Sequence, residues 1–97
     1  MEIVKNVENG KLEIKLIGQL DTTTAPMLEK EVSVLDGLKD IVFDFSELEY
    51  ISSAGLRVLL VVYKSKPADA NMTIKNANDE VLEVFEITGL IDVFNIV

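Results

Sequence analysis

Residues 41–66 read IVFDFSELEYISSAGLRVLLVVYKSK, and this stretch decides the fold. Its first five residues are typical of a short, mostly buried strand. The valines of residues 53–66 would also suit a strand, but this segment is longer than most strands and carries a helical stripe of apolar side chains. The stripe consists of Leu56, Leu59, Leu60 and Tyr63. Two successive parallel strands need a crossover, which is usually a helix. We therefore predict that residues 53–66 form a nearly all-apolar helix packed against a sheet.

Before this stretch, the chain carries the signature of a β-hairpin. Asn9-Gly10 is the strongest two-residue hairpin signal, because both turn positions need a positive φ. Ile3 to Val7 precedes it as a loosely alternating segment. Leu12 to Ile17 follows it as a half-buried strand that ends at Gly18.

Two more helices and two more strands are expected. The polar cluster Asp21–Thr24 is rich in N-cap residue types and precedes a helix that stops before Gly37. The apolar positions of that helix are Ala25, Leu28, Val32 and Leu35, with Pro26 in its first turn. Asn78 can cap a third helix that stops near Gly89 and buries side chains such as Val81, Val84 and Phe85. Residues 72–74 and 93–97 are predicted strands.

The resulting order is β-β-α-β-α-β-α-β, which predicts an α/β fold. The sheet is expected to be mixed, with an N-terminal antiparallel hairpin followed by parallel strands, and with helices packed against it. Functional loops of such sheets gather at the carboxyl ends of the strands. Two loops are expected at that edge, Asp21–Thr24 and Ser46–Gly55.

Composition excludes several classes of function. The 97 residues, of which 48% are hydrophobic, predict one domain over residues 1–97. The chain has no Cys and no His, so it lacks the atoms of a disulfide scaffold, a Cys/His zinc site or a His-based catalytic centre. The longest apolar run, Val58–Tyr63, is far shorter than the roughly 20 residues that span a bilayer, and no signal peptide is evident. We expect a cytoplasmic protein that is not an enzyme and binds no membrane, metal or cofactor.

The charge pattern argues against direct binding of nucleic acid. The net charge is -8, and the only basic stretch holds Arg57, Lys64, Lys66 and Lys75 without interleaved aromatic side chains for base stacking. An acidic surface keeps a protein in solution and favours a partner with a basic docking face. A protein partner is therefore expected.

Two serines open the predicted helix over residues 53–66, and they allow two readings. The hydroxyls of Ser52 and Ser53 can each accept a hydrogen bond from the exposed backbone N–H groups of the first turn. The other reading is phosphorylation, because a phosphoryl group adds roughly -1.5 to -2 charges where the helix dipole favours them. Such a modification would change the surface and leave the fold intact.

Residues 41–60 resemble the central signature of the STAS domain, specifically of the bacterial anti-sigma factor antagonists. The segment Gly18-Gln19-Leu20-Asp21 with Thr24-Ala25-Pro26 resembles the second loop of the family, and Phe85–Leu90 resembles its closing helix and turn. The resemblance implies a partner-switching protein. Its unphosphorylated form would bind an anti-sigma factor that is also a serine kinase, which frees the sigma factor. Phosphorylation would end this binding, and a PP2C-type phosphatase would reverse it.

The resemblance also assigns site residues. It places the phosphoacceptor at Ser53, although Ser52 stands where the family usually has Asp and is a second candidate hydroxyl. Asp21 matches a loop acid of the family and should lie near Ser53, where it could orient the hydroxyl or repel a phosphoryl group. It could equally bond the backbone N–H groups of its own turn. The remaining expected members of the phosphosite environment or partner-binding surface are Thr22, Thr23, Ala54, Gly55 and Arg57.

Two other functions remain open. The chain could be a STAS subunit with a constitutive scaffolding role, for example in a membrane transport complex, in which Ser53 is only a helix cap. It could also be a small enzyme or nucleotide-binding protein, but it has no Walker-type sequence, and Ser53 has no His or nearby Lys as a base. The free protein is expected to be a monomer.

Overall fold

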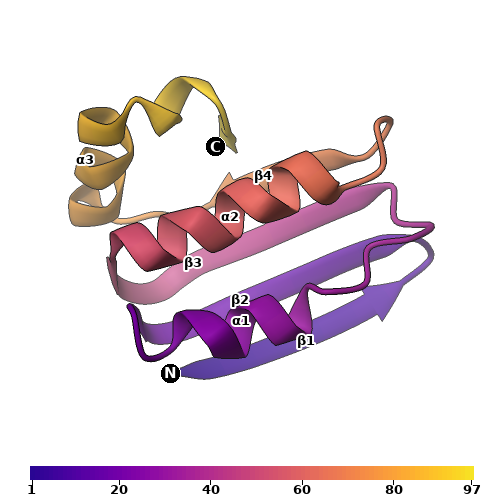
Figure 1. Ribbon diagram of the computed structural model, residues 1–97, viewed down its shortest axis with the longest axis horizontal. Coiled ribbons are helices and arrows are strands. Elements are labelled where there is room, and N and C mark those ends of the chain that lie inside the picture. The colour runs from indigo at the N-terminus through magenta and orange to yellow at the C-terminus, as the bar shows by residue number, and fades with distance from the viewer.

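The computed structural model describes all 97 residues and contains one five-stranded sheet in the order β1-β2-β3-β4-β5 (Figure 1). β1 pairs with β2 in the antiparallel sense, and β2, β3, β4 and β5 run parallel to one another. The strands are β1 Glu2–Glu8, β2 Lys11–Leu20, β3 Asp40–Ile51, β4 Asn71–Lys75 and β5 Asn95–Ile96. The mixed-sheet prediction is confirmed.

The hairpin between β1 and β2 forms where the sequence predicts it. Asn9 and Gly10 have φ values of 51° and 79°, as a two-residue turn of this kind requires. The pairing brings Val7 opposite Leu12 and Ile3 opposite Leu16. The turn therefore fixes which face of β2 points into the core.

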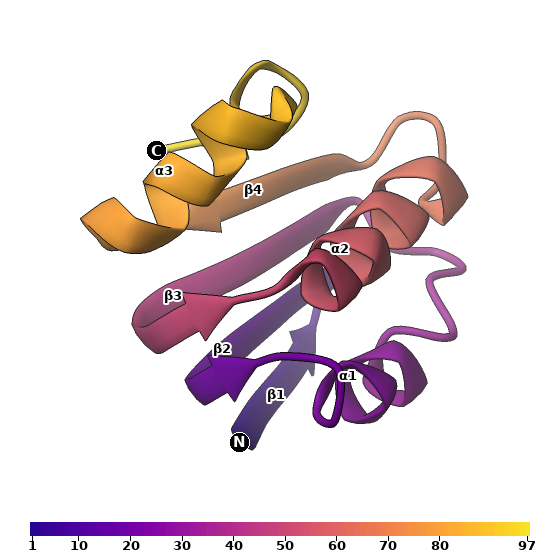
Figure 2. The ribbon, with the colours of Figure 1, turned by 60° about the vertical axis from the view of Figure 1, so that its left-hand side comes forward.

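The helices are α1 Ala25–Glu31, α2 Ser53–Ser65 and α3 Asp79–Thr88, followed by a short 3₁₀ helix at Leu90–Asp92. α1 and α2 lie side by side over one face of the sheet, and α3 stands at its far end beside β4 (Figures 1 and 2). Each strand adds to the sheet on the same side of the previous one, so right-handed crossovers place the connecting helices on one face. One hydrophobic cluster fills the space between, and Phe43, Phe45 and Phe85 are its largest fully buried side chains.

The buried stripe of α2 differs in part from the predicted one. Leu56 and Leu59 are buried as expected, but Leu60 is only half-buried and Tyr63 is 40% exposed. Val58 and Val62 are buried in their place. Tyr63 instead packs edge-on against Phe94 at a centroid distance of 5.9 Å, next to the C-terminal strand. The helix is thus rotated so that Val58 and Val62 point inward, while Val61 is exposed.

Several element boundaries also differ from prediction. β2 continues past Gly18 to Leu20, and β3 runs to Ile51, so most of the expected loop Ser46–Gly55 is strand. α1 ends at Glu31, because the Ser33 hydroxyl donates a hydrogen bond to the Lys30 carbonyl and the chain turns back toward β3. The buried side chains of Val32 and Leu35 belong to that irregular return segment. The expected strand over residues 93–97 is reduced to Asn95–Ile96 by the preceding 3₁₀ turn.

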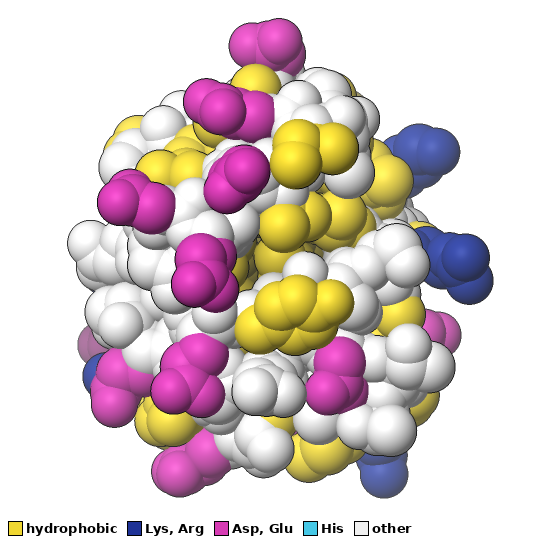
Figure 3. All heavy atoms as spheres, turned by 90° about the vertical axis from the view of Figure 1, so that its left-hand side faces the viewer, with side chains coloured by type: hydrophobic (Ala, Val, Ile, Leu, Met, Phe, Trp, Pro, Cys, Tyr) yellow, Lys and Arg dark blue, Asp and Glu magenta, His cyan; other side chains and the backbone are white.

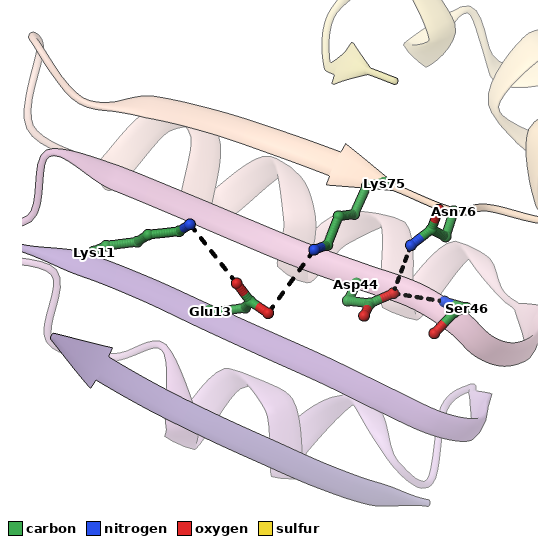
Figure 4. Close-up of polar contacts among 6 residues, drawn as sticks. All are labelled: Lys11, Glu13, Asp44, Ser46, Lys75 and Asn76. Carbon is green, nitrogen blue, oxygen red and sulfur yellow. Dashed lines mark hydrogen bonds and ion pairs between the residues drawn. The ribbon is translucent and has the colours of Figure 1, made fainter.

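The face of the sheet opposite α1 and α2 is open and polar (Figure 4). Glu13 on β2 lies between Lys11 and Lys75, at 3.8 and 3.9 Å. Asp44 on β3 accepts hydrogen bonds from the Ser46 N–H at 3.0 Å and from Asn76 Nδ2 at 3.2 Å. Alternating signs of charge keep this face solvated.

Candidate functional site at the carboxyl edge of the sheet

The candidate site begins where β2 and β3 end together. Leu20 and Ile51 pair as the last residues of these strands, and the Ser52 N–H donates to the Leu20 carbonyl at 2.9 Å. The chain then leaves β2 through Asp21 and leaves β3 directly into α2, so the two predicted site segments emerge side by side (Figure 2). The sheet register thus brings Asp21 and the serine pair to one place.

The two serines have different roles in the structure. Ser52 is the N-cap of α2, and its hydroxyl accepts the Gly55 N–H at a long 3.5 Å. Ser53 is the first helical residue and is exposed, and its hydroxyl makes no hydrogen bond within the chain. The expectation that each hydroxyl caps the helix is therefore wrong for Ser53. The geometry of a first helical residue points its side chain away from the exposed N–H groups, and only the N-cap residue can reach back to them.

Asp21 organises the loop between β2 and α1. Its Oδ1 accepts the N–H groups of Thr23 and Thr24 at 3.0 and 3.1 Å and the Thr23 hydroxyl at 2.7 Å. The Thr23 hydroxyl is the main reason that the pKa of the Asp21 carboxyl lies below its ordinary value, and the two backbone N–H groups reinforce it. The prediction that Asp21 bonds its own turn is confirmed. No hydrogen bond joins Asp21 to Ser53.

Thr24, the residue before α1, locks the loop onto β2. Its hydroxyl donates to the Gln19 carbonyl at 2.8 Å and accepts the Asp21 N–H at 2.8 Å. Its side chain does not cap α1, although the sequence pattern suggests a cap in this cluster. The first N–H group of α1, that of Ala25, donates instead to the backbone carbonyl of Asp21 at 2.8 Å. Thr22 and Thr23 are exposed at the tip. They therefore present side chains to solvent next to the start of α2.

Gly55 acts through packing and not through surface contacts. It is buried, and a Cβ at this position would lie 2.6 Å from Leu20 Cγ and 3.0 Å from Ile51 Cγ1. Only a residue without a side chain lets the first turn of α2 rest directly on the ends of β2 and β3. Ala54 is half-buried and packs against the same core. The close packing of these two residues fixes the position of Ser53 relative to the sheet.

Arg57 lies one helical turn beyond Ser53. It is exposed and forms no ion pair. By contrast, five of the eight lysines are paired, as Lys5–Glu31, Lys11–Glu13, Lys15–Glu47, Lys39–Asp69 and Lys75–Glu13. Its guanidinium is therefore the free cation of this site.

The surface around the site is apolar at its centre and acidic around it. Figure 3 shows hydrophobic side chains gathered in the middle of this end of the molecule, with acidic side chains bordering them and basic side chains at the margins. Tyr50, near the end of β3, and Ile87 of α3 are 46% and 77% exposed. The sequence interpretation did not assign either residue to the site.

A sequence signal for Tyr50 exists in β3. Its buried residues change from a spacing of two, at Ile41, Phe43 and Phe45, to a spacing of three, at Leu48 and Ile51. The register against β2 shifts twice in this region, as β-bulges require. A spacing of three inside a strand pattern thus indicates bulges that turn the intervening side chains outward.

Away from this edge, the molecule has an apolar groove and no metal-binding cluster. No three His, Cys, Asp or Glu side chains are grouped so that they could hold a metal ion. The main apolar depression is a groove of about 260 Å³ between α1 and α2, lined by Val32, Leu35, Val58, Val61 and Val62. None of the helices has the length and apolar character needed to cross a bilayer.

Comparison with known proteins identifies relatives along the whole chain. Residues 2–97 match the STAS domain family. BtrV of Bordetella bronchiseptica, which bears the name of an anti-sigma factor antagonist, is 35% identical over 97 residues, covering 97% of this chain and 84% of BtrV. The anti-sigma-B factor antagonist of Staphylococcus aureus is 32% identical over 99 residues, covering 99% of this chain and 92% of that protein.

Solved structures show the same fold. An anti-sigma factor antagonist from Mycobacterium paratuberculosis superimposes with a TM-score of 0.89 at 24% identity, covering 98% of this chain and 83% of that one. The Bacillus protein SpoIIAA, solved in its phosphorylated form, superimposes with a TM-score of 0.77 at 19% identity, covering 99% of this chain and 91% of that one. At these identities the likeness establishes the fold.

Proposed function

Because this chain belongs to the STAS domain family, we propose that it is an anti-sigma factor antagonist controlled by phosphorylation of Ser53. The unphosphorylated form binds an anti-sigma factor that is also a serine kinase, and the sigma factor is released. Phosphorylation ends the binding, and a PP2C-type phosphatase restores it. In this role the protein is a cytoplasmic ligand and substrate that needs no cofactor and performs no catalysis.

The free hydroxyl of Ser53 is the observation that carries this proposal. A kinase needs an exposed serine whose oxygen can reach the γ-phosphorus of ATP, and Ser53 is exposed and unbonded at the start of α2. In the transfer, Ser53 Oγ bonds to the γ-phosphorus, the bond to the bridging oxygen of ADP breaks, and the hydroxyl proton passes to a base of the kinase. Ser52 is a poorer acceptor, because its oxygen caps the helix and its side chain is half-buried.

Electrostatics support release after phosphorylation. The phosphoryl group adds roughly -1.5 to -2 charges to a surface that already carries the ionised Asp21 and an acidic border. A charge placed beside like charges in an interface costs several kcal/mol, and each 1.4 kcal/mol is about tenfold in affinity. We expect phosphorylation to weaken binding by about a hundredfold or more.

The test compares variants of the two serines against a purified anti-sigma factor kinase from the same genome. Ser53→Ala should bind with the affinity of the unphosphorylated protein and keep it in the presence of ATP, whereas Ser53→Asp should bind poorly. Intact mass after incubation with kinase and ATP should increase once, by about 80 Da for one phosphoryl group. The matched control Ser52→Ala should still gain this mass, and Ser53→Ala should not.

Two outcomes would contradict the proposal. Equal affinities of Ser53→Ala and Ser53→Asp for the kinase would show that no switch operates at this residue. Binding to the kinase that is unchanged by ATP would instead favour a constitutive scaffolding role, in which the start of α2 is only a structural element.

A further inference from the structure

We propose that Arg57 is the internal counterion of a phosphoryl group on Ser53, so that phosphorylation closes a phosphoserine–guanidinium pair on the outer face of α2. This inference rests on the proposed phosphorylation of Ser53. It adds a positioning role for Arg57, which holds the phosphoryl group to one place on the helix.

The helical spacing brings the two side chains together. Ser53 and Arg57 both belong to α2, four residues apart, and both are exposed. Residues at this spacing lie on the same side of a helix with their Cβ atoms about 5–6 Å apart. A phosphoryl group extends the short serine side chain toward the long arginine, and guanidinium can bind phosphate oxygens through two parallel N–H donors.

Arg57 is also free to form this pair. No acid lies within ion-pair distance of its guanidinium. The neighbouring α1 presents Glu29 to α2, but Glu29 lines the groove with Val58 and Val61 and forms no ion pair with Arg57. On the sheet side, the Asp21 carboxylate is occupied by Thr23 and Thr24. Glu49 is the other acid near the end of β3 and has no ion pair either.

No other cation of α2 can substitute for Arg57. Lys64 is eleven residues beyond Ser53, which corresponds to about 16 Å along a helix. The spacing also discriminates between the serines, because Ser52 precedes the helix and is one residue further from Arg57. The pair therefore fits a phosphate on Ser53.

The pair gives Arg57 two states. In the unphosphorylated protein its guanidinium is exposed and can contact a partner. In the phosphorylated protein it is bound to the phosphoryl group of its own chain. Phosphorylation would thus add negative charge and at the same time withdraw the free cation of the site.

The test needs no kinase, because phosphoserine can be incorporated at position 53 during translation. The second ionisation of phosphoserine, with an ordinary pKa of about 6, is followed by ³¹P NMR as a function of pH. In the otherwise unchanged chain, the ion pair should lower this pKa by about half a unit, a roughly threefold larger ionisation constant. In the Arg57→Gln chain the phosphoserine pKa should not be lowered in this way. In the Arg57→Lys chain it should be lowered in part.

Lys64→Gln is the matched control, since it removes one positive charge from the same helix without touching the pair. It should leave the phosphoserine pKa unchanged, and the contribution of the helix end is common to every variant. An equal phosphoserine pKa in the Arg57→Gln chain and in the unchanged chain would show that Arg57 does not pair with the phosphoryl group. An equal pKa would contradict the ion pair but not the proposal that the kinase phosphorylates Ser53. Conversely, a kinase that fails to phosphorylate Ser53 would contradict the proposed function but not an ion pair measured by NMR. The two proposals can therefore fail separately.

Discussion

Asp44 shows how a single polar residue is held on the open face of the sheet. Partial burial would raise the pKa of its carboxyl, but hydrogen bonds from the Ser46 N–H and from Asn76 outweigh this effect and hold the pKa below its ordinary value of 3.8. Asn76 adopts a left-handed conformation with φ of 64°, which brings its amide toward Asp44 (Figure 4). The carboxylate thereby ties the end of β4 to β3.

The pH dependence of stability follows from the sign of this shift. A carboxylate with a lowered pKa in the folded state stabilises the fold above its ordinary pKa, and the contribution is lost as the pH falls through the lowered value. We expect Asp44→Asn to cost about 1 kcal/mol at pH 7 and progressively less as the pH falls below 3.8. Urea denaturation of both proteins from pH 7 to pH 2 measures this difference.

The control for this prediction is Asp36→Asn, which changes an exposed carboxylate without hydrogen bonds or ion pairs. Its effect should be small at every pH. A cost of Asp44→Asn that is the same at pH 7 and pH 2 would mean that the neutral amide lacks something other than the charge.

At the scale of an element, the close packing of α2 on the ends of β2 and β3 depends on the absence of a side chain at Gly55. A Cβ would overlap the side chain of Leu20, which is fully buried and cannot move into solvent. Overpacking costs typically about 1–3 kcal/mol, and the better helix propensity of alanine returns up to about 1 kcal/mol. We expect Gly55→Ala to lower the free energy of unfolding by about 1–2 kcal/mol, measured by chemical denaturation.

A double-mutant cycle isolates the overlap. Leu20→Ala alone removes buried atoms and destabilises the protein, but it also makes room for the new Cβ. The two substitutions together should therefore cost less than the sum of their separate effects. Additive effects, or a more stable Gly55→Ala protein, would show that helix propensity governs this position.

Local sequence patterns predicted the elements better than their ends. Asn9-Gly10 fixed the hairpin, because its conformation is a property of those two residues. The length of β3 was missed, because its continuation to Ile51 depends on bulged pairing with β2. In this part of β3 the buried residues follow a spacing of three, which a search for strict strand alternation passes over. The end of α1 was also missed, since Val32 and Leu35 are buried by the return segment and imitate helical periodicity.

The same limit applies to the candidate site. Two adjacent serines before a helix look equivalent in sequence, and only the boundary of α2 separates the cap Ser52 from the exposed Ser53. The proximity of the Asp21 loop follows from the pairing of Leu20 with Ile51, which is a tertiary contact. The resemblance to STAS domains supplied the position of the phosphoacceptor, and the structure supplies the physical difference between its two candidate serines.

At the scale of the whole molecule, the proposed phosphosite lies outside everything that holds the fold together. The core consists of hydrophobic side chains only, and no polar or charged residue is buried in it. The Ser53 hydroxyl contributes no hydrogen bond to the fold. The buried residues on the opposite side of α2 are Gly55, Val58, Leu59 and Val62. A phosphoryl group on Ser53 would therefore lie at the surface, and adding it would break no contact that holds the fold together.

We expect the phosphorylated protein to keep its fold and to change only at this edge. Comparison of ¹H–¹⁵N spectra of the protein with serine and with phosphoserine at position 53 should show shifts in the first two turns of α2 and in the loop Asp21–Thr24. The backbone amide signals of Glu13 and Thr73, residues in the middle of β2 and β4 whose side chains point to the open face, should not move. Ser53→Asp serves as the control for a carboxylate in place of the phosphoryl group. Shifts that extend through β2, β3 and β4 would mean that phosphorylation rearranges the sheet. Shifts confined to this edge would mean that a partner responds to the altered surface alone.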